Sequence, residues 1–275
     1  MFQNEDFPRS PLEKPGWQLT FFDDFDSPLL DDMYWFPAYR SGRKEYFKRI
    51  GVPSRWQNHN AYYELNNSIL KLKISEDLPP RKNPQDWCVS CICTSDHRIG
   101  KDSSEFQILE KFAQEYGRFE IRCRCAKASG GLLNAFWLHH TDPTAQEYSP
   151  EGELRKTSGE KLEIDIFETI AKEITPESSY THFNVHFAEN AHFSPKLPID
   201  LSKHFHEIAV EWDPGTIGWF VNGKEVARYN GETPSGKMFI LLALFQYSGW
   251  IGEIDPETKY PKEFEIDYVR VYKRV

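Results

Sequence analysis

The sequence lacks any long run of apolar residues. None approaches the roughly 20 apolar residues that a membrane-spanning helix needs, so we expect no membrane partner. It also lacks an excess of positive charge, because 42 acidic side chains outnumber 33 lysines and arginines for a net charge of −9. A negative chain is a poor binder of nucleic acid or anionic lipid. These absences exclude nucleic acid as an expected partner. We also expect the protein to be a monomer.

The first residues lack the apolar segment of a secretion signal. Residues 1–15 are polar and rich in proline, with no hydrophobic stretch of the length that a signal peptide carries. Two localisations remain open: a cytoplasmic protein, or a secreted protein from which the signal has been removed. We expect this segment to be an extension that precedes the folded domain.

A complete disulfide framework is missing as well, since the chain has five cysteines, an odd number. Cys88 and Cys91 have the spacing of a metal or redox pair. Against this, Cys91 and Cys93 share strand parity, as do Cys123 and Cys125, which would place small apolar thiols on one buried face. The pattern favours core thiols, and a zinc site or a disulfide are the alternatives.

Helical periodicity is scarce, and short runs of alternating apolar and polar residues take its place. Turn residues separate these runs, and Asn222-Gly223 is a strong hairpin signal. About a dozen strands with long connections predict an all-β fold, a jelly-roll sandwich of two antiparallel sheets. No linker divides the chain, so we expect one domain over residues 16–275. The main expected strands are residues 17–22, 68–74, 88–94, 117–125, 134–140, 180–187, 205–212, 218–226, 238–245 and 264–272.

Residues 161–169 (KLEIDIFET) carry the strongest chemical pattern. Glu163 and Asp165 alternate with apolar residues, as on a strand with one buried face. Glu168 has the wrong parity for that face, and one β-bulge near Ile166 and Phe167 would restore it. Two carboxylates held about 5–5.5 Å apart would suit a retaining glycosidase. An ordinary solvent-facing acidic strand is the alternative for the bare pattern.

Two other segments stand out. Residues 34–56 combine aromatic and basic side chains, and such a loop either borders a binding cleft or folds over a sheet edge. Residues 141–160 form a long polar insertion.

The order of motifs along the chain resembles glycoside hydrolase family 16. Each motif alone is common, but their order and spacing are specific, and they cover almost the whole chain. The motifs are residues 17–25 (WQLTFFDDF), 116–122 (YGRFEIR), 135–138 (AFWL), 163–168 (EIDIFE), 205–206 (FH) with 211–212 (EW), 219–223 (WFVNG), 249–252 (GWIG) and 266–272 (IDYVRVY).

The resemblance implies a curved, concanavalin A-like jelly roll with a glycan cleft on its concave sheet. It implies endo-acting hydrolysis of β-linked glucans or galactans with retention of configuration, and no cofactor for catalysis. By position, Glu163 would be the nucleophile, Glu168 the acid/base, and Asp165 would orient Glu163. Three neighbouring carboxylates cannot all ionise cheaply, so one pKa should rise and supply a proton donor near neutral pH.

The same resemblance suggests substrate-binding residues. Trp137 has parity opposite to its apolar neighbours and should face the cleft, with a core position as the alternative. His186 resembles the family's cleft histidine, with a core histidine as the alternative, and Trp250 lies on a substrate-contacting loop. Asn134 stands where family glucanases often have proline and could bind a hydroxyl, and we add Arg122 to the expected binding residues.

Many family members hold a structural calcium ion on the convex side. Asp24 and Asp267 match two of its ligand positions. Ser68 replaces a glycine that usually supplies a carbonyl, and could still supply one. These residues are the expected metal ligands if the protein binds calcium.

The sequence thus predicts a retaining endo-glycosidase acting on a polysaccharide or oligosaccharide, with β-1,3 or β-1,3/1,4-glucan favoured. The alternatives are hydrolysis of marine galactans (agar, porphyran or carrageenan) and transglycosylation on the same scaffold. A non-catalytic lectin is the alternative from another class, but a lectin has no need for three clustered acids.

Overall fold

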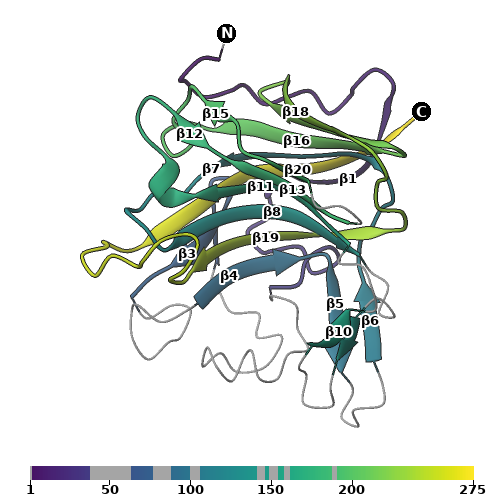
Figure 1. Cartoon of the computed structure of the whole chain (residues 1–275), viewed down its shortest axis with the longest axis horizontal. Helices are drawn as coiled ribbons and strands as arrows, with labels where there is room; N and C mark the ends of the chain where they lie inside the picture. The colour runs from purple at the N-terminus through teal and green to yellow at the C-terminus, as the bar shows by residue number, and fades with distance from the viewer. Residues whose placement is uncertain are drawn as a thin grey trace.

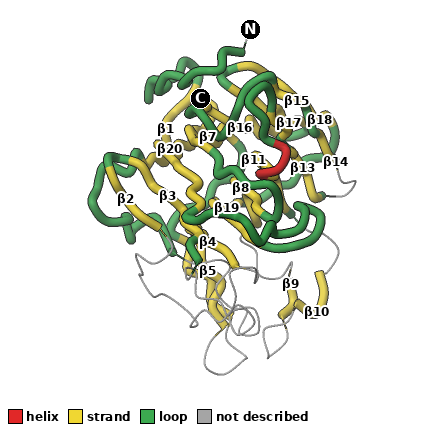
Figure 2. The backbone as a smooth tube through the Cα atoms, turned by 90° about the vertical axis from the view of Figure 1, so that its left-hand side faces the viewer, coloured by secondary structure: helices red, strands yellow, loops and turns green. Residues whose placement is uncertain are grey.

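The computed structural model describes residues 2–37, 63–76, 88–99, 106–140, 146–148, 154–157, 162–187 and 191–275. Nearly all of its regular structure is antiparallel β-sheet (Figure 1). A short 3-10 helix, η2 (Ala171–Glu173), directly follows one strand and is the red turn in Figure 2. Across these ranges, no helix is both long and apolar enough to span a membrane.

The larger sheet has eight strands. Strand β20, the final strand in sequence order, lies in the interior of this sheet. It pairs with β7 on one side and with β3 and β1 on the other. The order is β18 (Lys224–Asn230), β17 (Thr216–Val221), β16 (His206–Asp213), β7 (Gly117–Arg124), β20 (Lys262–Arg274), β3 (Ile69–Ile74) and β2 (Tyr63–Asn66), with β1 (Trp17–Asp23) also on β20.

The second sheet has six strands and carries the acidic segment at its centre. Its order is β14 (Ala191–Phe193), β13 (His182–His186), β11 (Glu163–Ile170), β8 (Leu132–His140), β19 (Met238–Gln246) and β4 (Cys88–Cys93). Short two-stranded pairs add β12 (Ser179–Tyr180) with β15 (Lys196–Leu197), β5 (Ser95–Ile99) with β6 (Phe106–Glu110), and β9 (Gln146–Tyr148) with β10 (Leu154–Thr157).

Apolar side chains from both sheets form one core between them. Phe119 and Ile121 of β7 meet Leu138 of β8 and Ile164 of β11 in a single buried cluster. Burial of this surface is the main stabilising term of the sandwich, at about 25 cal/mol per Å². The predicted jelly-roll sandwich is therefore confirmed, and the long alternating strands lie within a few residues of the expected ranges.

A second apolar cluster covers the opposite face of the six-stranded sheet. It includes Trp137 of β8, Leu241 and Ala243 of β19, and Cys91 of β4. The central strands of this sheet are therefore buried on both faces, which explains why β19 is apolar almost throughout.

The five cysteines are buried and form no disulfide, as the favoured interpretation predicts. Cys88 belongs to the core between the sheets, whereas Cys91 lies in the cluster on the other face. Three residues along a strand change the face, so the Cys88-x-x-Cys91 spacing does not bring these thiols together.

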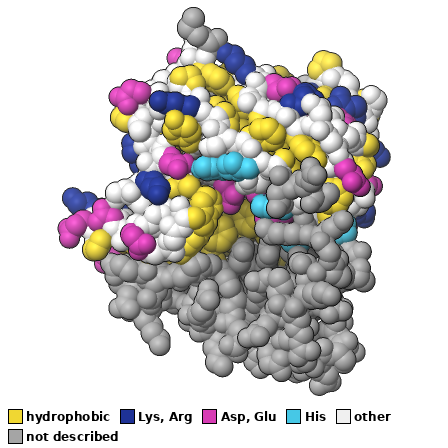
Figure 3. Space-filling model, viewed as in Figure 1, with side chains coloured by type: hydrophobic (Ala, Val, Ile, Leu, Met, Phe, Trp, Pro, Cys, Tyr) yellow, Lys and Arg dark blue, Asp and Glu magenta, His cyan; other side chains and the backbone are white. Residues whose placement is uncertain are grey.

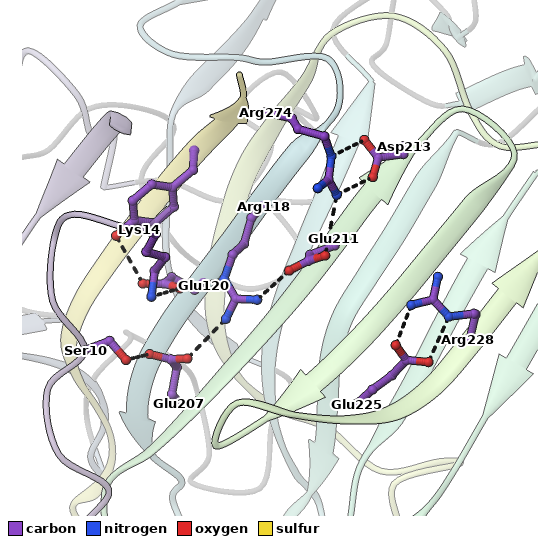
Figure 4. Close-up of polar contacts among 11 residues, drawn as sticks. Ser10, Lys14, Arg118, Glu120, Glu207, Glu211, Asp213, Glu225, Arg228 and Arg274 are labelled. Carbon is purple, nitrogen blue, oxygen red and sulfur yellow. Dashed lines mark hydrogen bonds and ion pairs between the residues drawn. The ribbon is translucent and has the colours of Figure 1, made fainter. Parts of the chain in front are cut away.

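The N-terminal segment is packed against the domain. The backbone N–H of Phe7 donates to the carbonyl of Phe205 at 2.7 Å, and Lys14 pairs with the buried Glu120 at 3.2 Å. Ser10 hydrogen-bonds Glu207 on the same outer face of the eight-stranded sheet (Figure 4). Residues 2–15 thus form a strap over this face.

The two other segments singled out in the sequence lie largely outside the described residues. Of residues 34–56, only 34–37 are described: Trp35 is buried, and its indole N–H donates to Asp23 at 2.7 Å. Of residues 141–160, the structure describes only β9 and β10.

Candidate active site

The acidic strand β11 contains the predicted bulge. Asp165 lies opposite Asn184 of β13, but Glu168 lies opposite His182, so three steps on β11 match two on β13. The extra residue lets Ile166 and Phe167 both enter the core. Beyond the bulge, Glu168 returns to the face of Asp165.

The pairing with β8 shows this common face independently. Asp165 lies opposite Trp137, and Glu168 lies opposite Ala135. Positions 135 and 137 share a face of their strand, and directly paired residues point the same way. Glu163, two residues before Asp165, shares that face as well. The structure therefore brings the three predicted acids together on the outer face of the six-stranded sheet.

The bulge is anchored from the other sheet. Trp219 of β17 is fully buried, and its indole N–H donates to the backbone carbonyl of Asp165 at 3.0 Å. A bulge interrupts the ladder of backbone hydrogen bonds, and a buried carbonyl without a partner would be costly. Trp219 supplies this partner and so fixes the position of the bulge relative to the other sheet.

Asp165 is the most enclosed of the three acids, with 2% of its surface exposed. Asn184 donates to its Oδ2 at 2.8 Å, and His186 Nε2 lies 3.2 Å from the same atom. Burial, and next the charge of Glu163, raise the pKa of Asp165 above its ordinary value. This raised pKa belongs to Asp165 and has burial as its first cause, and the expected proton donor near neutral pH stays a prediction.

His186 lies where the sequence placed it. It is opposite Glu163 in the pairing of β11 with β13, with Nε2 3.8 Å from a Glu163 oxygen. Among the described side chains, the one group of three or more that could share a metal ion is Glu163, Asp165 and His186. Two of these are candidate catalytic acids and the third is the candidate substrate-binding histidine, so they do not define a separate metal centre.

The two tryptophans differ in exposure. Trp137 lies beside Asp165 on the acid face and packs against Phe245 with ring centroids 5.8 Å apart. Trp250 is 54% exposed, and its ring meets His182 edge-on at 6.1 Å. Figure 3 shows one face of the molecule, in the same view as Figure 1. Histidines lie beside acidic side chains near the middle of that face, with hydrophobic side chains around them. Sugar binding by either tryptophan stays a prediction.

Two of the expected binding residues lie elsewhere. Asn134 is fully buried with parity opposite to Trp137, and its amide hydrogen-bonds the backbone of Ala126 in both directions. Arg122 belongs to the eight-stranded sheet, where it pairs with Asp267 at 2.7 Å and donates to the carbonyl of Phe7. Both predictions of substrate contact were wrong, because each side chain is committed to an internal partner away from the acids.

The expected calcium ligands are also committed. Arg9 of the strap bridges them, with nitrogens 3.1 Å from Asp24 and 3.2 Å from Asp267. Asp24 further pairs with Arg270, and Asp267 with Arg122. Calcium needs six to eight oxygen ligands, whereas these carboxylates face three guanidinium groups. The two carboxylates therefore do not fit a calcium ion. Ser68, the third expected ligand, lies in the turn between β2 and β3.

Sequence reasoning missed four polar residues: Asn184, which contacts the acids, and His182, His192 and Glu173, which connect to it. His182 and Asn184 share a face with His186, since all three alternate with the buried Phe183 and Val185. This alternation was a usable signal. His192 of β14 and Glu173 of η2 had no comparable signal, because their positions depend on tertiary pairing.

The chain was compared with known protein families and with relatives of known name. The family model "Glycosyl hydrolases family 16" matches residues 51–270. A β-glucanase of Rhodothermus marinus is 29% identical over 95% of this chain and 87% of its own length. Several other curated relatives are longer, and the chain spans 34% to 46% of them.

Solved structures agree. A GlcNAcα1-4Gal-releasing endo-β-galactosidase from Clostridium perfringens superposes with a TM-score of 0.76 at 25% identity, covering 98% of this chain and 65% of that one. The catalytic domain of a laminarinase from Thermotoga petrophila gives a TM-score of 0.69 at 20% identity, covering 94% and 98%. The chain therefore belongs to family 16 of the glycosyl hydrolases and is a glycosidase.

Proposed function

We propose that the protein is a retaining endo-glycosidase that cleaves β-linked polysaccharide by double displacement. One observation carries this proposal: the bulge in β11 returns Glu168 to the face of Glu163 and Asp165. Two carboxylates on one strand face, separated by one bulge, suit a mechanism in which one attacks and the other transfers protons.

In the first step, Glu163 attacks the anomeric carbon and forms a glycosyl ester. The bond to the leaving oxygen breaks, and Glu168 gives that oxygen its proton. In the second step, Glu168 takes a proton from water, and the resulting hydroxide attacks the anomeric carbon. The ester bond breaks, Glu163 regains its negative charge, and Glu168 is again protonated.

Asp165 separates the two working carboxylates. Its raised pKa favours the protonated form, which limits repulsion with the charge of Glu163. Asn184 and His186 hold its Oδ2 in place. Asp165 thus keeps Glu163 oriented for attack while reducing the free-energy cost of crowding three acids.

A β-1,3 or β-1,3/1,4-glucan is the proposed substrate. The support is the curated relative named β-glucanase that aligns along nearly the whole chain, together with the laminarinase neighbour. A β-galactan is the second candidate, because the endo-β-galactosidase superposes with a higher TM-score than the laminarinase. We further propose that the protein acts as a monomer without nucleic acid or membrane partners.

A reducing-sugar assay against laminarin, lichenan, agar, porphyran and carrageenan tests the reaction and its substrate. Proton NMR of the first product should show the β-anomer, as retention requires. An initial α-anomer would contradict the double displacement. Binding to a glycan without turnover would support the lectin alternative, and new longer oligosaccharides would support transglycosylation. Light scattering at working concentration checks the monomer.

A further inference from the structure

A continuous line of polar side chains joins helix η2 to the acidic strand. It begins at Glu173, passes through His182 and His192, and reaches Asn184. Asn184 then contacts two of the three acids. The double displacement described above uses Asn184 only to hold Asp165, and it assigns no role to Glu173, His182 or His192.

Asn184 bridges the acids on either side of the bulge. Its Nδ2 lies 2.8 Å from Asp165 Oδ2 and 3.0 Å from Glu168 Oε2, so each of its two N–H groups has one carboxylate. An amide nitrogen offers two donors and no acceptor. Both donors of Asn184 are therefore directed at the acids. Its side chain is buried and projects from β13.

His192 sets the orientation of this amide. With its nitrogen facing the acids, Asn184 presents Oδ1 to His192 Nδ1, 2.6 Å away. An oxygen can only accept, so His192 must donate through Nδ1–H. Burial, and next the neighbouring His182, lower the pKa of His192, which favours the neutral ring. A reversed amide would place two donors in contact and its oxygen against the carboxylates.

His192 is itself held in place. Its ring stacks on His182 with centroids 5.4 Å apart and an interplanar angle of 24°. His182 lies directly opposite Glu168 in the strand pairing, and its Nε2 is 2.8 Å from Glu173. Because η2 follows β11 without a gap, the same chain segment that carries the acids also supports the far end of the line.

We propose that Asn184 is a positioning residue that holds Glu168 and Asp165 in register across the bulge, and that His192 determines its orientation. This inference rests on the proposed function, because it assigns Glu168 the acid/base role. A carboxyl that transfers a proton in both steps must keep one oxygen directed at the glycosidic oxygen. Asn184 fixes the other oxygen, Oε2, and so restricts rotation of the group.

The test compares two leaving groups. The wild-type enzyme, Asn184→Leu, His192→Ala and His192→Asn are assayed for kcat/KM on the best polysaccharide from the panel. They are also assayed on an aryl β-glycoside of the same sugars with a dinitrophenolate leaving group. Dinitrophenolate departs without a proton, so its release does not need a well-placed acid. Glu168→Ala is the benchmark for complete loss of the acid.

We expect Asn184→Leu to lose about tenfold to a hundredfold on the polysaccharide, the effect of misplacing a catalytic group by about 1 Å. On the aryl glycoside, we expect a loss below about threefold in kcat/KM, the pattern of a misplaced acid. His192→Ala should show a smaller loss of the same pattern. His192→Asn should restore most of the activity, because the asparagine Nδ2–H can replace the imidazole Nδ1–H.

Asn230→Leu on the exposed part of β18 and His204→Ala, paired with Asp6 at the strap, are matched controls and should not change either rate. If Asn184→Leu unfolds at the assay temperature, the comparison of folded His192→Ala with folded His192→Asn tests the positioning role. Equal losses on both substrates, or no difference between His192→Ala and His192→Asn, would overturn the positioning role while leaving Glu168 as the acid. A wild-type enzyme inactive on every glycan, or a Glu168→Ala enzyme with near-wild-type kcat/KM on the polysaccharide, would instead overturn the proposed function, and the positioning role with it.

Discussion

The outer faces of the two sheets both bury carboxylates, but they neutralise them differently. On the eight-stranded sheet, Glu120 is 0% exposed and is paired with Arg118 at 2.8 Å and Lys14 at 3.2 Å (Figure 4). On the six-stranded sheet, Asp165 is held by the neutral amide of Asn184 and by His186.

The direction of the pKa shift does not separate the two faces. Burial is the first cause in both cases, and it raises the pKa of Glu120 as well as that of Asp165. What differs is the partner. The guanidinium of Arg118 keeps its charge at any working pH, so it holds Glu120 in an ion pair. The amide of Asn184 orients Asp165 without neutralising a charge.

The largest expected effect is a loss of catalysis when carboxylates on the six-stranded sheet are replaced, with no such loss for the eight-stranded sheet. Glu163→Gln and Glu168→Gln should each lower kcat by three or more orders of magnitude, since covalent and proton-transfer steps both need a carboxylate (roughly 10²–10⁴ for proton transfer alone). Glu120→Gln is the matched control and should retain kcat. Steady-state kinetics on folded variants measures this. A folded Glu163→Gln enzyme with near-normal turnover would remove the distinction between the faces.

Asp165→Asn should lower kcat but stabilise the fold at neutral pH. A carboxyl whose folded pKa is raised binds its proton more tightly when folded, so stability falls as pH rises through the interval between the unfolded and folded values. Above that interval the penalty is complete, and the amide avoids it. Thermal unfolding at pH 4 and pH 8 should show the advantage of the variant at pH 8. An advantage confined to pH 4 would contradict the sign.

Asn134→Ala tests the corrected position of this residue. Its amide satisfies the backbone N–H and carbonyl of Ala126, and removal leaves buried groups unpaired, at about 1–3 kcal/mol of folding free energy. Urea unfolding should show this loss, while kcat/KM of the folded variant stays at the wild-type value. A selective rise in KM would return Asn134 to the substrate.

The smallest effect concerns Arg9, which is 43% exposed on its side chain. Arg9→Ala should lower stability by about 1 kcal/mol, the scale of a partly exposed ion pair. Adding calcium or a chelator should leave the melting temperature of the wild type unchanged, because Arg9 bridges the two carboxylates. Stabilisation of the wild type by calcium would show that the ion displaces this arginine.

Much of the fold follows from local pattern. Strand alternation predicted β7 and β11, a nearly continuous apolar run predicted β19, and the parity of Glu168 predicted the bulge. The same parity argument also contradicted Asn134, which lies three residues before Trp137 and so cannot share its face. The family comparison suggested a role for Asn134 that its strand position excludes.

Other features depend on which strands become neighbours. Arg122 has the outward parity of a binding residue, but parity does not reveal which sheet a strand joins. The His192–Asn184 contact requires β14 to pair with β13, and Arg9 reaches Asp267 across 258 positions of sequence. Such contacts follow from tertiary register, which short-range pattern does not determine.

The interior position of β20 has a consequence for biosynthesis. Residues 262–274 pair with β3, β7 and β1, so the strand translated after all its partners completes the middle of the eight-stranded sheet. Until it emerges from the ribosome, β3, β7 and β1 have exposed edges that can pair with other chains. The sandwich therefore closes in a late step dominated by long-range contacts, which favours slow folding. A nascent chain stopped before residue 262 would depend on a chaperone to remain unaggregated.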